Sequence, residues 1–143
     1  MNATPPPAGR RPHVLIVGGG ASGVLMAAAL LARPEGALRV TLVERGPLLG
    51  RGLAYATERP EHLLNTPAAL MSARPDLPDD FVAWLRANGT PGARGADFAE
   101  RGRYGRYLEQ ILAPWRGDPG RLRCLRAEVV RLDEDRGGVV RAR

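Results

Sequence analysis

The chain has 143 residues, of which 44% are hydrophobic and 25% charged, the composition of a globular protein with room for one hydrophobic core. Its net charge of +6 is carried by arginines scattered along the chain without an aromatic stacking platform, so we expect no nucleic-acid partner. One cysteine and two histidines exclude a disulfide framework and a cysteine-based zinc site; we expect no metal, and a reducing compartment such as the cytoplasm.

Residues 1–12, MNATPPPAGRRP, are polar and proline-rich, which predicts a disordered tail ahead of one domain at 13–143. The paired arginines before an apolar run are also a feature of export signals and membrane anchors. A twin-arginine signal would have Ser or Thr before the pair, whereas Gly9 stands there. A spanning helix needs ~20 apolar residues, and the run is broken by GGGASG. We therefore expect a folded domain without a membrane partner.

The first folded segment has the pattern of a strand, a helix and a second strand. His13–Val17 is a continuous apolar run that ends at glycines, as in a strand buried on both faces of a parallel sheet. Ser22–Ala32 is rich in Ala and Leu and predicts a helix, and Leu38–Val43 is rich in β-branched residues and predicts a strand. The chain is thus expected to have an α/β fold with a parallel sheet and a right-handed connection.

The glycines between strand and helix have the spacing of a dinucleotide-binding turn. In this motif Gly18 permits the tight turn, Gly20 lets the backbone approach a pyrophosphate, and Gly23 lets helix and strand pack closely. The helix N-terminus offers free N–H groups to the phosphates. Glu44, at the end of the next strand, is placed to accept hydrogen bonds from ribose hydroxyls. The turn residues predicted to bind a nucleotide are Gly18, Gly19, Gly20, Ala21, Ser22 and Gly23.

The residues after the second strand bear on which nucleotide binds. Glu44 disfavours NADP because a carboxylate repels a 2′-phosphate, and Arg45 beside it offsets this only in part, so FAD and NAD both remain open. Arg45 is itself predicted to contact the cofactor. The glycine pair Gly50 and Gly52 follows in RGPLLGRGLAYA. This segment is either backbone that passes close to a bulky cofactor, which would place Gly52 in the site, or an ordinary surface loop.

Four ordered blocks extend the pattern over residues 13–133: VLIVGGGASGV, VTLVERGPLLGRGLAYA, HLLNTPAALMSARPDLPDDFVAWL and RGRYGRYLEQIL. With them the chain resembles the FAD/NAD(P)-binding domain proteins of bacteria, flavoproteins related to flavin monooxygenases and amine N-hydroxylases. The resemblance implies a Rossmann-like FAD-binding domain, with FAD as cofactor, NAD(P)H as electron donor and a small-molecule substrate. It places the adenosine end at the glycine turn and Glu44, Asn65 toward the flavin, and the backbone of Val129 beside the adenine.

The chain departs from the family in two places. Glu100 precedes Arg101 where the family has Pro-Arg, so we assign no role to that arginine. Such proteins also run on through a closing strand and further domains, which predicts that this chain is the N-terminal part of a longer flavoprotein or a short relative. No nucleophile–base pair is present and no catalytic residue is assigned, which suits a flavin that carries the electrons. The alternatives are an NAD-binding domain and a non-catalytic nucleotide-binding module.

The other segments read as structural. Two sets of residues recur at helical spacing, the first with Asp79 or Asp80 as cap and Gly89 at its end, the second ended by Pro114. We expect the aromatic residues of both to pack in the core rather than stack on a cofactor. Segment 121–133 predicts one or two strands with Cys124 facing the core, and DRGGV a turn into a last strand. The two helical sets are Phe81, Trp84, Leu85 and Asn88, and Tyr104, Tyr107, Leu108, Ile111 and Leu112.

Overall fold

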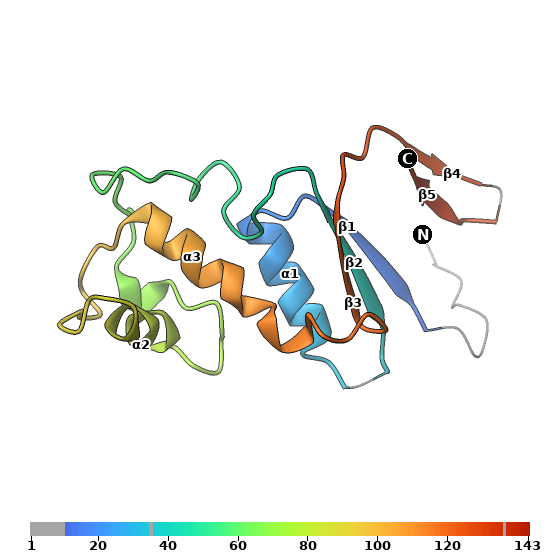
Figure 1. Ribbon diagram of the computed structural model, residues 1–143. Helices are drawn as coiled ribbons and strands as arrows, with labels where there is room; N and C mark the ends of the chain where they lie inside the picture. The colour runs from blue at the N-terminus through green and yellow to red at the C-terminus, as the bar shows by residue number, and fades with distance from the viewer. Residues whose placement is uncertain (1–10, 35, 136) are drawn as a thin grey trace.

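The computed structural model describes residues 11–34, 36–135 and 137–143, so most of the predicted disordered tail lies outside the described residues. A three-stranded parallel sheet with the order β1-β2-β3 forms its centre (Figure 1). The strands are β1 (His13–Val17), β2 (Arg39–Glu44) and β3 (Leu122–Arg126). The prediction for β1 is confirmed at both ends, and β2 is shifted by one residue from its predicted range.

The helices lie in layers on one side of this sheet (Figure 1). Helix α1 (Ala21–Leu31) packs against the sheet, and α3 (Arg101–Ile111) packs on α1. Helix α2 (Asp80–Ala87) contacts α3, and short 3-10 turns occur at Ala68–Leu70 and Ala113–Trp115. The predicted helix at 22–32 is therefore confirmed within one residue. Among the described residues, none of the helices combines the length and the apolar character needed to cross a bilayer.

An antiparallel hairpin follows the sheet. It consists of β4 (Leu132–Glu134) and β5 (Val140–Ala142), and it lies on the side of the sheet away from α1 (Figure 1). Its turn is held by Asp135, whose Oδ1 accepts hydrogen bonds from the N–H groups of Gly137 and Val139. Segment 121–133 was predicted to form one or two strands, and it contributes to two, β3 and β4; the predicted turn into a last strand is confirmed.

The aromatic residues of α2 and α3 form a cluster at the contact between these helices. Phe81, Tyr104 and Tyr107 are buried, and the ring centroid of Phe81 lies 5.1 Å from that of Tyr104 and 5.0 Å from that of Tyr107. Trp84 is half-buried, and its Nε1 donates to Oε1 of Gln110 over 2.8 Å. The prediction that these rings pack in the core is confirmed.

The start of α2 differs from the prediction. Asp79 occupies the N-cap position, but its side chain makes no capping hydrogen bond, because its φ of −92° and ψ of 7° are not the extended conformation of a capping residue. The carboxylate of Asp80 instead accepts a hydrogen bond of 2.7 Å from the hydroxyl of Tyr107. Gly89, with φ of 97°, ends the helix as predicted.

Tyr107→Phe should destabilise the fold. The Tyr107 hydroxyl accepts a hydrogen bond from the N–H of Ala73 over 2.9 Å while it donates to Asp80, so its removal leaves both partners without it. We expect a loss of about 1–3 kcal/mol in the free energy of unfolding, measured by urea titration. Tyr104→Phe is the matched control, because within the described residues the Tyr104 hydroxyl forms no hydrogen bond. Equal losses for the two variants would contradict this account.

Candidate functional site

The turn between β1 and α1 has the geometry that the glycine spacing predicts. Gly18 has a φ of 100°, a left-handed conformation that favours glycine, and its N–H donates to the carbonyl of Val43 over 2.8 Å. A Cβ on Gly23 would lie 1.9 Å from the carbonyl oxygen of Gly18, so the first turn of α1 can approach β1 only with glycine there. These two residues shape the turn.

A cavity of about 710 Å³ opens in front of this turn. It is lined by Gly18, by residues 20–23 and Met26, and by residues 51–55 of the loop that follows β2. Gly20 is the N-cap of α1, and no side chain caps the helix. The N-terminal N–H groups of a helix attract anions, through hydrogen bonding and through the helix dipole. The predicted residues Gly20, Ala21, Ser22 and Gly23 thus lie together on a cavity wall suited to phosphate.

Glu44 connects the turn to the loop that follows β2. Its Oε2 accepts a hydrogen bond from the N–H of Gly19 over 2.7 Å, and its Oε1 accepts one from the N–H of Gly46 over 2.6 Å. The N–H of Gly46 is the main cause that holds the pKa of Glu44 below its ordinary value, with further contributions from the N–H of Gly19 and the charge of Arg45. The carboxylate is ionised and fixed, and each oxygen has a further lone pair for a ribose hydroxyl.

Gly19 joins the turn to the loop that follows β2. Its N–H donates to the carboxylate of Glu44. A Cβ at this position would lie 2.6 Å from Cδ2 of Leu49 and 2.8 Å from Cβ of Glu44. Glycine is therefore needed at position 19 to let the turn pack against the loop after β2.

A smaller cavity of about 220 Å³ adjoins the turn at the carboxyl ends of β1 and β2. Glu44, Arg45, Gly18 and Val129 line it together, so the structure brings four predicted site residues to one place from three separate segments. Arg45 lies 3.6 Å from the carboxylate of Glu128, and both of these side chains are exposed. This cavity has the size of a nucleoside subsite rather than of a complete dinucleotide.

Residues 50–57, which we call the strap, cross in front of the turn. The N–H of Gly50 donates to the carbonyl of Gly19 over 2.7 Å. Gly20 and Gly52 face one another so closely that a Cβ on Gly20 would lie 3.4 Å from Cα of Gly52. Of the two interpretations of this glycine-rich segment, the structure favours backbone beside the site, and Gly52 lines the cavity of the turn.

A third cavity of about 510 Å³ continues from the strap, because Leu53 and Ala54 line both it and the cavity of the turn. His62 and Leu63 form its far side. Asn65 is exposed two residues further on and does not line this cavity. The sequence patterns did not assign Leu53 and Ala54 to the site, although their place just after Gly52 in the GRGLAYA block is a signal for them.

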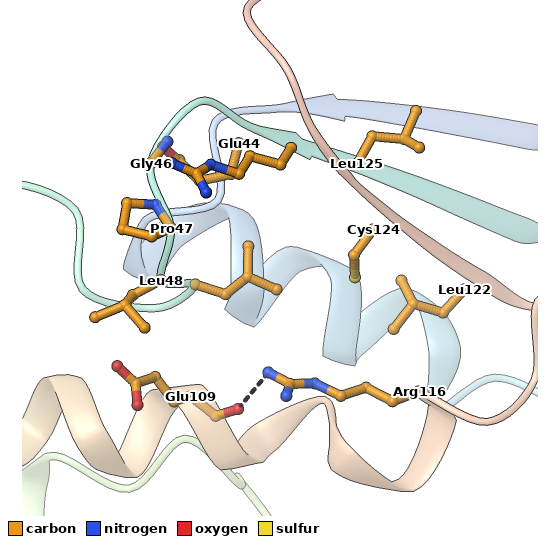
Figure 2. Close-up of a pocket in the computed structure, with 11 residues that line it drawn as sticks. Glu44, Gly46, Pro47, Leu48, Glu109, Arg116, Leu122, Cys124 and Leu125 are labelled. Atoms are coloured by element: carbon orange, nitrogen blue, oxygen red, sulfur yellow. Dashed lines mark hydrogen bonds between the residues drawn. The ribbon is translucent and has the colours of Figure 1, made fainter.

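Figure 2 shows another cavity, of about 510 Å³, on the helix side of the sheet. Cys124 points into it from β3 and is exposed, which corrects the prediction that this side chain faces the core. The reason is that β3 is an edge strand, and α3 packs on α1 rather than over it. Partial burial raises the pKa of the Cys124 thiol, whereas the charge of Arg116 opposes the shift.

A family model for FAD-NAD(P)-binding proteins matches residues 15–143. The chain belongs to this family. The family assignment confirms the predicted resemblance and the predicted class of cofactor. Among curated proteins, none matches the sequence significantly.

Several solved structures share the fold. The FAD-NAD(P)-binding chain superposes on an S-allyl-L-cysteine S-oxygenase from Allium sativum with a TM-score of 0.64 at 22% identity, over 93% of this chain and 32% of that one. An ornithine N-hydroxylase from Kutzneria sp. 744 was solved with reduced FAD, NADP+ and ornithine. It superposes with a TM-score of 0.64 at 20% identity, over 88% of this chain and 30% of that one. The protein OTEMO, in complex with FAD and NADP, superposes with a TM-score of 0.58 at 16% identity, over 94% of this chain and 23% of that one. The chain thus spans a third or less of each.

Glu44 should stabilise the fold in a pH-dependent way. Because its pKa is lowered in the folded state, its contribution is fully present above the ordinary value of 4.5 and is lost as the pH falls through the folded pKa. Glu44→Gln should therefore lower the urea midpoint at about pH 7, and much less at an acidic pH where the carboxyl group is protonated in both the folded and the unfolded state. Glu58→Gln, at an exposed position, is the control. If Glu44→Gln lowered the urea midpoint by the same amount at both pH values, this role of Glu44 would be contradicted.

Gly23→Ala should destabilise the fold, because its Cβ would overlap the carbonyl of Gly18. We expect a loss of about 1–3 kcal/mol or more in the free energy of unfolding. Gly20→Ala should fold normally, since its Cβ meets Gly52 only at contact distance, and Gly92→Ala has open space and serves as control. Urea unfolding of the three variants tests whether Gly23→Ala is the least stable of them. Wild-type stability of Gly23→Ala would show that the turn can shift.

Proposed function

We propose that this chain binds FAD, with the ADP part held by GGGASG and Glu44, as the FAD-binding domain of a flavin-dependent oxidoreductase. The observation that carries the proposal is the continuity of three cavities. The cavity at Glu44 and Val129 shares Gly18 with the cavity of the turn, and that cavity shares Leu53 and Ala54 with the one at His62. An extended dinucleotide needs such a path, and a mononucleotide does not.

Each part of FAD finds suitable groups along this path. The ribose hydroxyls would donate to the free lone pairs of Glu44, and the adenine would lie between Arg45 and the backbone of Val129. The pyrophosphate would lie over the N-terminus of α1, where no side chain competes for its N–H groups. The flavin would then extend past Leu53 and Ala54, with Asn65 further along the same segment as Leu63.

The glycines at the turn fit this ligand on structural grounds. A Cβ on Gly18 would have nothing within 4 Å, so that position faces open space where a cofactor can approach the backbone. Gly20 lines the same cavity and would have room for a methyl group in the protein alone. Glycine at position 20 is thus not required by the packing of the described residues, which points to a requirement set by the ligand.

FAD supplies hydride acceptance or oxygen activation when bound, and the residues of this chain bind it, orient it and cover its phosphates. The activity that we propose is the oxidation or oxygenation of a small-molecule substrate with NAD(P)H as electron donor, in the cytoplasm. Its support is the family, together with the oxygenase and N-hydroxylase that share the fold. That activity is proposed for the whole flavoprotein; binding of FAD is the part proposed for this chain.

The protein should co-elute with FAD in gel filtration and show the visible absorbance of a bound flavin. Gly20→Ala, which should fold, would lose this absorbance, because its methyl group occupies the approach to the pyrophosphate. Glu44→Ala should weaken FAD binding by about 1–3 kcal/mol. A colourless wild-type peak that is folded by circular dichroism would refute the proposal, and titration with NAD would then test the NAD-binding alternative. Gly92→Ala should bind FAD like the wild type.

A further inference from the structure

The strap lies directly on the backbone of α3. A Cβ on Gly102 would lie 2.4 Å from the carbonyl oxygen of Thr57, and a Cβ on Gly105 would lie 2.5 Å from that of Tyr55. Both distances are shorter than the contacts that real Cβ atoms make, so these two positions of α3 have no room for a side chain. The helix therefore presents a glycine face to the strap along its first two turns.

The strap is also confined from the other side. Gly50 binds the glycine turn through its N–H, and its own Cβ would lie 2.8 Å from Cβ of Leu108 and 3.0 Å from the backbone nitrogen of Glu109. The start of the strap thus fills the space between the turn and α3. The contact of the strap with α3 therefore bears on its distance from Gly20.

One ion pair joins the side chains across this contact. Arg51 of the strap donates through Nε to Oε1 of Glu109 on α3, and the two side chains are 16% and 24% exposed. Charge-assisted hydrogen bonds between partly buried groups are stronger and more directional than those on the surface. Arg51 also lines the cavity of the turn, so the pair lies beside the predicted path of the pyrophosphate.

We propose that Glu109 is a positioning residue for FAD. It holds Arg51, and with it the strap, at the distance from Gly20 that leaves room for a pyrophosphate. This inference rests on the proposed binding of FAD and adds a residue of α3 that contacts neither the turn nor the three cavities of the path. Gly102, Gly105 and Glu109 share one helix face. The residues on this face contact the strap and not the hydrophobic core.

The test is a double-mutant cycle with Glu109→Gln and Arg51→Gln, read by FAD titration. Each single variant should bind FAD about tenfold more weakly, and the double variant should bind it no more weakly than Arg51→Gln alone. Asp97→Asn is the matched control, because it also replaces the carboxylate of an arginine ion pair, at 3.7 Å from Arg94 in a different loop. Wild-type affinity of Glu109→Gln would overturn the proposal, even if its urea midpoint falls, because a purely structural role predicts that result.

Amide hydrogen exchange without FAD separates this inference from the proposed function. The Gly50 amide donates to the carbonyl of Gly19, so it should exchange faster in Glu109→Gln than in the wild type or Asp97→Asn. If the wild type bound no FAD, the proposed function would be wrong. Faster exchange of the Gly50 amide in Glu109→Gln would still show that Glu109 holds the strap in place. Unchanged exchange would overturn that hold as well.

Discussion

The carboxylate of Glu44 joins the parts of the site. It lies at the end of the central strand, and it binds the N–H groups of Gly19 in the turn and Gly46 in the following loop. Because each of its two oxygens accepts a hydrogen bond from a different backbone N–H, the carboxylate has little freedom to rotate. The loop that it fixes leads to Gly50, which binds the turn again. The start of α1 and the start of the strap are therefore placed relative to one another by three hydrogen bonds around one acidic side chain.

The local part of the fold could be predicted from sequence. The strand at His13–Val17, the helix after it and the second strand follow from short-range patterns, and their ends are right within one or two residues. Gly18 and Gly23 could also be assigned, because their roles depend only on the adjacent strand and helix. Glu44 was found by its position, but only as a ribose ligand. Its second role depends on the shape of a loop that has no periodic pattern.

The contacts that sequence reasoning missed join distant segments. Arg51 and Glu109 are 58 positions apart, and each by itself looks like an exposed charge on a loop or helix. Cys124 occurs in a strand pattern that fits a buried side chain, but its burial depends on which helix covers β3. Gly102, Gly105 and Glu109 share a helix face, but nothing local in the sequence says which segment lies on it.

Helix α3 connects two regions of different character. Tyr104 and Tyr107 point into the aromatic cluster with Phe81, whereas Gly105 and Glu109 meet the strap. The ring of Tyr55 on the strap also packs edge-on against Tyr104, with centroids 4.9 Å apart. The cluster thus supports the strap from behind, and the same helix contributes to stability on one side and to the shape of the site on the other.

The place of β1 in the sheet has a consequence for how the sheet can be extended. Within the described residues β1 pairs with β2 alone, so one edge of the apolar segment HVLIV presents backbone N–H and C=O groups without a partner strand. Such an edge is a template for strands of other molecules, and no lysine, proline or bulge blunts it between positions 13 and 17. A further strand, from this protein or from another, would extend the sheet at this edge.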